Sequence, residues 1–296
     1  MSFDHVVVMG AGAIGSLYAA KLAAHNDVTV IARPDHVAAI ERNGLRVIGH
    51  ETFTCRPRAL TAAPPLEPRT LVLLTTKVNA NQAAAAGIVD CLRDDTLILC
   101  VQNGIHGEDI VRSIVGHRCQ VLRGITQFGA IFREPGVIDF KVSGHTLVEM
   151  HPRSPAIVAL LTASGLDGRL CDTIAVEVWR KLIFNCVINP ITAIIGSDVG
   201  TIADERLNPI KQLVVDECLR VARAEGVAFD IDFLTAIAEV FGPSRNTASM
   251  RQDLLKRKPT EIDHMNGAVV AIGDRLGIDC PVNRALVAII KAMERF

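Results

Sequence analysis

The stretch HVVVMGAGAIGSLYAAKLAA, residues 5–24, joins an apolar run to three closely spaced glycines and a segment with helical spacing. The apolar run predicts a buried strand, and the last part predicts a helix. The glycines between them follow the pattern G-x-G-x-x-G. This pattern at the start of a strand–helix–strand unit is typical of folds that bind a dinucleotide, although an ordinary glycine-rich turn can also produce it.

Each glycine has a separate expected role in such a fold. Gly10 permits the tight turn, Gly12 lets a pyrophosphate approach the backbone, and Gly15 lets the helix pack closely on the strand. Together with Ala13 and Ile14, the glycines form the predicted cofactor-binding turn. The helix that begins there offers free N–H groups and a partial positive charge to a phosphate.

Strand-like and helix-like patches alternate over about the first 170 residues. Further buried strands are predicted at VTVIA, LVLLTT and TLILCV, and helices at Pro34–Asn43, ANQAAAAGIVDCL and SPAIVALLTAS. A β-rich stretch lies before the last of these helices, with turns at Pro135-Gly136 and Ser143-Gly144. Continuous apolar strands that alternate with helices indicate a parallel, doubly wound sheet.

From about Asp172 onward the pattern is almost entirely helical. The predicted fold class is therefore α/β, with an N-terminal Rossmann-type sheet followed by an all-α domain. The expected domains are 1–170, which binds a nucleotide, and 171–296, which is all-helical.

The composition excludes several classes of protein. The 296 residues are 49% hydrophobic and carry a net charge of -1, so neither a disordered chain nor a nucleic-acid-binding surface is expected. The eight cysteines are scattered without a CxxC motif, which favours reduced thiols in the cytoplasm. The N-terminus does not resemble a signal peptide, and no membrane span or metal site is expected.

Three polar residues follow predicted strands, at the sheet edge where open α/β folds bind ligands. Arg33 follows the second strand, where an NAD enzyme would carry an acidic residue for the ribose hydroxyls. A guanidinium there suits a 2′-phosphate, so NADP (NADPH) is the predicted cofactor, and the nearby Asp35 leaves NAD as the alternative. Lys77 and Asn103 follow the strands LVLLTT and TLILCV, and both are expected to face the ligand.

A stripe of polar residues interrupts the apolar segment WRKLIFNCVINPITAIIG, residues 179–196. Lys181, Asn185 and Asn189 fall within an arc of about 80° on a helix, whereas the residues around them should be buried. Pro190 is expected to kink the helix and to leave one carbonyl without its usual partner. The stripe predicts a cleft wall with a lysine acid and two amides facing a nicotinamide. The alternative is a kink capped by Asn189, with Lys181 reaching solvent.

A second polar cluster lies in NTASMRQDLLKRKPTEIDHMNG near the C-terminus. Asn246 and Ser249 precede a charged segment, and a helix is expected to start at Thr260 as its N-cap, with Asp263 three residues later. On this interpretation Glu261 is only a carboxylate in the first turn of that helix.

These segments together resemble the ketopantoate reductase family (2-dehydropantoate 2-reductases) over nearly the whole chain. GAGAIG, TTK, QNG, WRKLIFNCVINPITAI and SMRQDLLKRKPTEIDHMNG occur in the family's order and approximate spacing. The Lys-x3-Asn-x3-Asn-Pro helix and the Ser-Met…Thr-Glu-Ile-Asp segment are specific to it, whereas the glycine pattern is not.

The resemblance implies an NADPH-dependent reduction of ketopantoate to D-pantoate in pantothenate biosynthesis. It implies that Lys181 is the general acid and that Glu261 is a carboxylate that binds substrate, rather than a first-turn residue only. It also implies roles for six more residues: Asn185, Asn189, Asn246 and Ser249 at the substrate, Arg33 and Lys77 at the 2′-phosphate, and Asn103 near nicotinamide and substrate.

Departures from the family's pattern bear on the substrate. Asn81 lies in a segment after Lys77 where an aromatic residue or Gln is common, and His106 replaces a smaller or amide residue. A paralogue that reduces another 2-oxo acid, or a non-catalytic NADP-binding sensor, are therefore the alternatives. The apolar faces of AVVAIGDRLGI and RALVAIIKAM also suggest a homodimer as one way to bury them.

Overall fold

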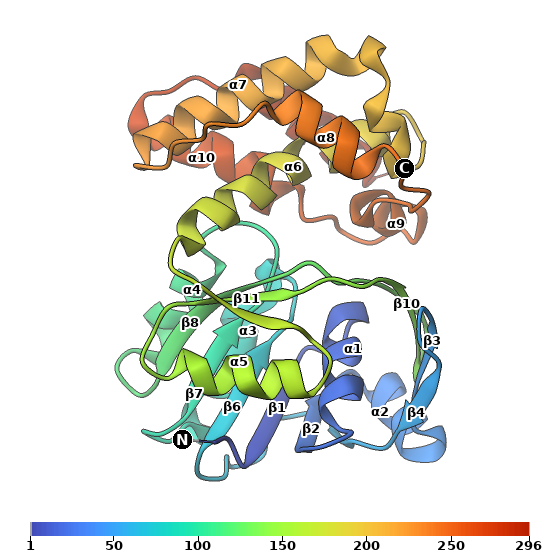
Figure 1. The fold of residues 1–296 in the computed structure, drawn as a ribbon, viewed down its shortest axis with the longest axis vertical. Helices are drawn as coiled ribbons and strands as arrows, with labels where there is room; N and C mark the ends of the chain where they lie inside the picture. The colour runs from blue at the N-terminus through green and yellow to red at the C-terminus, as the bar shows by residue number, and fades with distance from the viewer. Residues whose placement is uncertain (1, 296) are drawn as a thin grey trace. The chain divides into compact units, whose positions relative to one another are not determined.

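The computed structural model describes residues 2–295, and the chain divides into two compact units (Figure 1). The first unit comprises the residues up to Gln102 together with His106–Ile174. The second comprises Asn103–Ile105 and the residues from Ala175 on. By its contacts, the short segment that follows the strand TLILC therefore belongs to the second unit.

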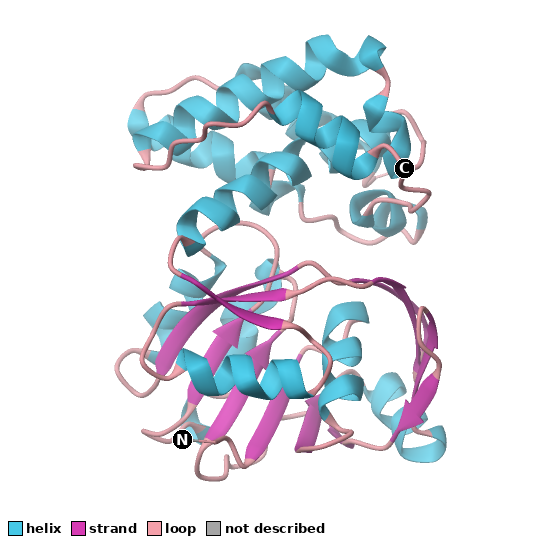
Figure 2. Cartoon of the chain, viewed as in Figure 1, coloured by secondary structure: helices cyan, strands magenta, loops and turns pink. Residues whose placement is uncertain are grey.

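The first unit is built on an eight-stranded sheet with the order β12-β11-β8-β7-β6-β1-β2-β5. In that order, its strands are Gly168–Cys171, Thr146–Glu149, Gln120–Thr126, Leu97–Cys100, Thr70–Leu74, His5–Met9, Asp27–Ile31 and Arg58–Leu60. Figure 2 shows the strands in magenta. The six strands from β8 to β5 are parallel, and β11 is antiparallel to β8. From β1 the chain adds β2 on one side and later β6 on the other. The strand order therefore reverses beside β1, where doubly wound folds bind their ligands.

Both faces of this sheet are covered, which explains its continuous apolar runs. Val6 and Val8 of β1 belong to a core with residues of α1 and α5, whereas Val7 and Met9 belong to a second core with residues of α3 and α4. Successive side chains of a strand point to opposite faces, so one apolar run supplies both cores. The four helices are α1 Ala13–Leu22, α3 Asn81–Ala86, α4 Gly107–Val115 and α5 Ser154–Ala163.

A smaller four-stranded sheet, with the order β4-β3-β10-β9, completes the first unit together with α2 Pro34–Asn43. Its strands are Phe53–Cys55, Leu45–Gly49, Val137–Val142 and Gly129–Glu134. Leu45, Val47, Ile138 and Phe140 join the same core as α1, which therefore contacts both sheets. The sequence predicted the β-rich stretch and its turns but not the pairing of β10 with β3, which is far away in the chain.

The predicted helix ANQAAAAGIVDCL is shorter in the structure. The α-helix α3 ends at Ala86, and Gly87 caps it. Only short 3₁₀ turns flank it, η1 Val78–Ala80 and η2 Val89–Cys91. Glycine has a low helix propensity, so it is a natural place for the helix to end.

The second unit is helical. Its α-helices are α6 Ile174–Ile194, α7 Asn208–Ala224, α8 Phe233–Phe241, α9 Ser249–Leu255, α10 Asn266–Leu276 and α11 Pro281–Met293, with 3₁₀ turns η3 Val199–Ala203, η4 Glu205–Leu207 and η5 Ile262–His264. One hydrophobic core contains residues of all these α-helices. Among residues 2–295, no helix is long and apolar enough to cross a membrane.

The start of one helix differs from expectation. The helix expected to begin at Thr260 begins instead at Asn266, because residues 262–264 form the 3₁₀ turn η5. The Thr260 hydroxyl does accept a bond from the Ile262 N–H, but it also bonds Glu294 of the C-terminal segment. Pro190 lies inside α6, which continues past it to Ile194.

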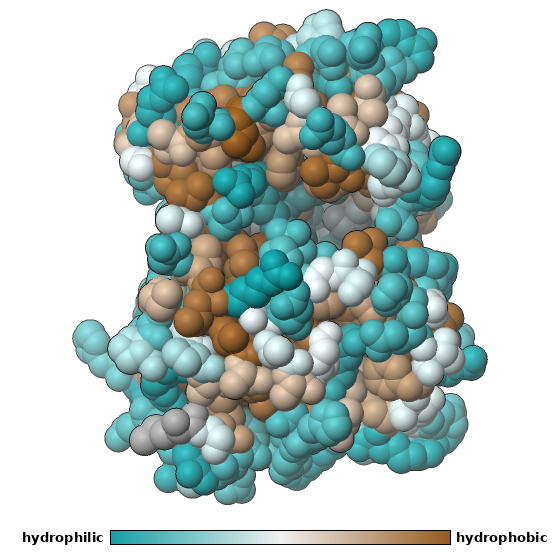
Figure 3. Space-filling model, viewed as in Figure 1, coloured by the Kyte–Doolittle hydropathy of each residue, from teal (hydrophilic) through white to brown (hydrophobic). Residues whose placement is uncertain are grey.

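Some apolar residues of the C-terminal helices remain at the surface. Leu276 of α10 and Ile289 of α11 keep 41% and 44% of their surface exposed, whereas Val269 and Ile290 of the same helices are buried. On the face drawn in Figure 3, hydrophobic residues are interspersed with hydrophilic ones. A homodimer that covers such residues remains a proposal.

Candidate functional site

The glycine turn of the first unit needs glycine at two positions for steric reasons. Gly10 has φ +102°, and a Cβ there would lie 2.6 Å from the backbone N of Thr76. A Cβ at Gly15 would lie 2.3 Å from the carbonyl oxygen of Gly10, so the start of α1 packs directly on the turn. The Thr75 hydroxyl, at the end of β6, donates to the same oxygen at 2.8 Å.

Gly12 differs, because a Cβ there would meet nothing within 4 Å. It is the N-cap of α1, whose N-terminus has no side-chain cap and no acidic residue in its first turn. Ala13 and Ile14, the next residues, are half-buried in this first turn. The turn therefore presents backbone N–H groups to open space, which fits the phosphates of a dinucleotide.

A buried side-chain network supports this sheet edge, and sequence reasoning missed it. Gln102, which follows β7, donates to the carbonyl oxygen of Thr76 at 2.8 Å. Asn81, fully buried at the start of α3, donates to Gln102 at 3.1 Å and to the Gly107 carbonyl at 2.8 Å. The network ties together the loops after β6 and β7. Asn81 therefore has a structural role, although from the sequence it was only a departure from the family's pattern.

Arg33 and Lys77 follow β2 and β6, the two strands that flank β1. The Arg33 side chain is 68% exposed, and its ion pair with Asp35 is long at 3.9 Å. Lys77 is half-buried and precedes η1. The structure thus places one cation on each side of the glycine turn.

His36 was not identified from the sequence, but it connects three parts of the first unit. The Gly136 N–H donates to its Nδ1 at 2.9 Å, so its Nε2 carries the proton and donates to Ser16 at 3.0 Å. Burial lowers the pKa of His36 and keeps the ring neutral. The ring holds α1, α2 and the β9–β10 turn together, close to Arg33 in the chain.

The three residues of the predicted stripe all lie on α6, in the second unit. Lys181 and Asn185 are half-buried, and Asn189 is 6% exposed. The Ser249 hydroxyl, at the start of α9, donates to Asn189 Oδ1 at 3.5 Å, and Asn189 Nδ2 lies 3.5 Å from the Met265 sulfur. Two residues that the sequence placed 60 positions apart are therefore in contact.

Asn246 and Asn103 are placed by loops of the same unit. The Val199 N–H donates to the Asn246 carbonyl oxygen at 2.8 Å, so η3 holds the segment before α9. Gly104, next to Asn103, packs so closely on His264 that a Cβ would lie 2.6 Å from its carbonyl oxygen. This contact places Asn103 beside η5, the turn that follows Glu261.

Glu261 is half-buried at the start of η5, and the residue before it is firmly anchored. The Thr260 N–H and hydroxyl donate to Glu294 Oε1 at 2.9 and 2.7 Å. Burial opposes ionisation of Glu294, but these bonds and Lys291 outweigh it and lower the pKa of its carboxyl. A charged Glu294 therefore holds the segment that presents Glu261.

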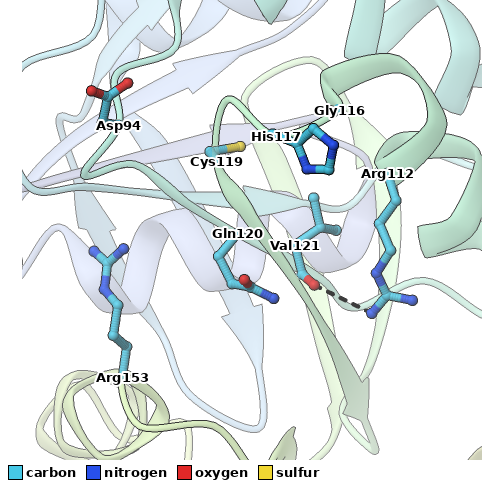
Figure 4. Close-up of a pocket in the computed structure, with 8 residues that line it drawn as sticks. All are labelled: Asp94, Arg112, Gly116, His117, Cys119, Gln120, Val121 and Arg153. Atoms are coloured by element: carbon cyan, nitrogen blue, oxygen red, sulfur yellow. Dashed lines mark hydrogen bonds between the residues drawn. The ribbon is translucent and has the colours of Figure 1, made fainter.

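A surface hollow of about 660 Å³ lies elsewhere on the first unit (Figure 4). The guanidinium of Arg112 already bonds Asp109 and the Val121 carbonyl, and that of Arg153 bonds the Asp95 carbonyl. The two guanidinium groups at the hollow are therefore already hydrogen-bonded to other groups of the protein. None of the expected site residues lines the hollow, which is formed by Asp94, Arg112, Gly116, His117, Cys119, Gln120, Val121 and Arg153. Among residues 2–295, no cluster of His, Cys, Asp or Glu could hold a metal ion.

Comparison with known proteins identifies the family. Residues 6–153 match the model of the family described as ketopantoate reductase PanE/ApbA, and residues 173–294 match the model of its C-terminal domain. A 2-dehydropantoate 2-reductase from Pyrococcus horikoshii is 34% identical over 98% of this chain and 97% of its own length. The chain belongs to the ketopantoate reductase family and is an oxidoreductase.

Solved structures agree with this assignment. A PanE/ApbA family ketopantoate reductase from Ralstonia eutropha is 33% identical, with a TM-score of 0.90 over 98% of both chains. A D-mandelate dehydrogenase, solved with NADH and anilino(oxo)acetate, is 25% identical with the same TM-score over 98% of both chains. The predicted fold class is thereby confirmed, and the structural neighbours include proteins named for different substrates.

Proposed function

We propose that the chain reduces 2-dehydropantoate (ketopantoate) to D-pantoate with NADPH, in pantothenate biosynthesis in the cytoplasm. The observation that carries this proposal is the Lys181–Asn185–Asn189 stripe on α6, with Ser249 bonded to its last member. The relative named as a 2-dehydropantoate 2-reductase supports the choice of substrate. The described cysteines are all free thiols, which supports the cytoplasm.

The first unit supplies the groups for the cofactor. The glycine turn and the N-terminus of α1 would bind the pyrophosphate, and Arg33 and Lys77 would bind the 2′-phosphate. Asn103 would lie near the nicotinamide and the substrate. When bound, the cofactor supplies a hydride to the ketone carbon of the substrate.

Lys181 is proposed as the general acid. As the ketone carbon gains a hydride, negative charge develops on the carbonyl oxygen, and the Lys181 ammonium donates a hydrogen bond and then a proton to it. The ketone thus becomes a hydroxyl, with its new C–H bond from the hydride and its O–H proton from Lys181. Proton transfer of this kind typically contributes about 10²–10⁴-fold to the rate.

The remaining polar residues of the second unit would hold the substrate. Asn185, Asn189 and Asn246 offer amide groups, Ser249 a hydroxyl and Glu261 a carboxylate. The contact between Ser249 and Asn189 fixes two of these groups relative to each other before any ligand binds. Such preorganisation keeps the reacting carbonyl close to Lys181.

Two other functions compete with this one. A different 2-oxo acid could be the substrate, and the structural similarity to a D-mandelate dehydrogenase favours that alternative. The second alternative is a sensor that binds NADP without turnover. A sensor of this kind would not need the lysine and the two amides of the polar stripe.

The experiment that separates them is the oxidation of NADPH and NADH by the purified protein, with 2-dehydropantoate beside a panel of other 2-oxo acids. A clear preference for 2-dehydropantoate and NADPH is expected. Preference for another acid would assign the chain to a paralogue, and tight NADPH binding without turnover would make it a sensor.

A further inference from the structure

Pro190 leaves a gap in the hydrogen bonding of α6. In an α-helix, the N–H of residue 190 would bond the carbonyl of residue 186, but proline has no N–H. Cys186 is fully buried, so water cannot easily satisfy its carbonyl oxygen. A buried carbonyl without a partner is destabilising, so another donor is needed at this place.

That donor is the side chain of Asn266. Its Nδ2 lies 3.0 Å from the Cys186 carbonyl oxygen, and the same amide donates to Asn283 Oδ1 at 2.9 Å. Asn266 is the first residue of α10 and is fully buried. Its carboxamide replaces the backbone N–H that Pro190 lacks.

The amide is itself held in place from two further helices. Asn283 of α11 donates its backbone N–H and its Nδ2 to Glu217 Oε2, at 2.9 and 2.7 Å. The other oxygen of Glu217, on α7, accepts the Val282 N–H at 2.9 Å. Glu217 and Asn283 are both buried, so the network is rigid and shielded from solvent.

The hydrogen bond from Asn266 to the Cys186 carbonyl fixes a part of α6 that contains two residues of the polar stripe. Asn185 immediately precedes Cys186, and Asn189 follows it by three residues and immediately precedes Pro190. Met265, the neighbour of Asn266 in the chain, contacts Asn189 Nδ2 through its sulfur. Residues 265 and 266 therefore hold α6 at two points, one on a backbone carbonyl and one on a stripe side chain.

We propose that Asn266 is a positioning residue for the reaction: by bonding the carbonyl that Pro190 leaves open, it fixes where α6 presents Asn185 and Asn189. The inference rests on the proposed function, because it assigns those two amides to the substrate. Pro190 and Asn266 form a complementary pair, because the Asn266 side chain supplies the hydrogen-bond donor that the backbone lacks at Pro190.

The test uses the full-length protein and the variants Asn266→Ala, Pro190→Ala and their combination. Asn266→Ala should lower kcat for 2-dehydropantoate reduction about tenfold, because misplaced substrate contacts weaken orientation, while the Kd for NADPH stays the same. Pro190→Ala restores the backbone N–H, so the double variant should recover to within about threefold of wild type, which is strong coupling between the two sites.

Asn81→Ala is the matched control. It removes an equally buried asparagine that also donates to one side-chain oxygen and one backbone carbonyl, but that belongs to the first unit and not to the network on α6, so Pro190→Ala should not rescue it. Rescue of Asn266→Ala but not of Asn81→Ala supports the proposal. Equal activity of Asn266→Ala and wild type, or a double variant as slow as Asn266→Ala, overturns it.

Two further outcomes remain decisive. If Asn266→Ala does not fold, a folded and active double variant supports the proposal, and an unfolded or inactive one overturns it. If the wild type reduces no 2-oxo acid, the proposed function has failed on its own. Amide hydrogen exchange in residues 186–194 then decides whether the coupling exists: faster exchange in Asn266→Ala, restored in the double variant, supports it, and unchanged exchange overturns it.

Discussion

The edge of the first unit that is proposed to bind phosphate and the polar stripe of the second are built in opposite ways. The edge consists mainly of backbone groups within residues 10–15, whose geometry depends on Gly10 and Gly15. The stripe depends on side chains from distant segments, which meet α6 through Ser249, Met265 and Asn266. A site built from consecutive backbone groups can be recognised in the sequence as a short motif. A site assembled from side chains of distant segments can be identified only in the folded structure.

The stripe should carry the chemistry, and Lys181→Ala tests this with the largest expected effect. Without the general acid, kcat should fall about 10²–10⁴-fold, while the Kd for NADPH should not change. Steady-state rates and fluorescence titration of NADPH measure the two quantities. Lys258→Ala, an exposed lysine of the same unit, should leave both unchanged. An unchanged kcat in Lys181→Ala would remove the lysine from the mechanism.

Alanine substitutions at Gly15 and Gly12 should affect different properties, with Gly15→Ala lowering stability and Gly12→Ala lowering the affinity for NADPH. In Gly15→Ala the new methyl group collides with the Gly10 carbonyl, so the free energy of unfolding should fall by about 1–3 kcal/mol. In Gly12→Ala the methyl group meets open space, so stability should change by less than about 1 kcal/mol. NADPH affinity should still fall about tenfold or more in Gly12→Ala, because the methyl group lies where the pyrophosphate approaches. Urea unfolding and NADPH titration of both variants give the comparison, and equal stability losses would contradict it.

Arg33→Ala tests whether the edge distinguishes the two nicotinamide cofactors. The loss of charged hydrogen bonds to the 2′-phosphate should weaken NADPH binding about 10–100-fold. NADH has no such phosphate, so its Kd should stay within the error of the titration. Arg42→Ala is the control, because Arg42 is also exposed and lies on α2, the helix that begins directly after Arg33. A parallel loss of affinity for both cofactors would mean that Arg33 does not recognise the phosphate.

The smallest expected effect is on the free energy of unfolding and concerns Glu294, which holds the segment that presents Glu261. The pKa of Glu294 is lowered in the folded protein, so its stabilising effect is present above its unfolded pKa and is lost as pH falls through its folded pKa. Glu294→Gln should therefore unfold about 1 kcal/mol more easily than wild type near pH 7, and the difference should shrink below about pH 4. Urea titrations at both pH values measure it, with exposed Glu239→Gln as control. A difference that does not depend on pH would rule out the charge as the cause.

The sequence predicted the parts of the fold that depend on local pattern. The apolar runs of β1, β2, β6 and β7 and the helix Pro34–Asn43 are present where the sequence placed them. It missed the 3₁₀ turn before α10 and the pairing of β10 with β3, because both depend on contacts between distant segments.

At the site, the proline and the two asparagines of α6 could be read from their spacing. Pro190 even predicted a carbonyl without its usual partner. The donor, Asn266, could not be identified, because nothing local marks it as the residue that reaches Cys186, 80 positions away. His36 and Gln102 were missed for the same reason: their partners are set by the folded sheet edge.

Rapid mixing of enzyme, NADPH and 2-dehydropantoate would follow cofactor binding by fluorescence and hydride transfer by absorbance in one experiment. If the first unit binds NADPH and the second supplies the general acid, Lys181→Ala should keep the binding phase and lose the hydride-transfer phase. Gly12→Ala should show weaker binding but, at saturating NADPH, a transfer rate close to that of wild type. Both variants slowing the same phase would contradict this division of roles.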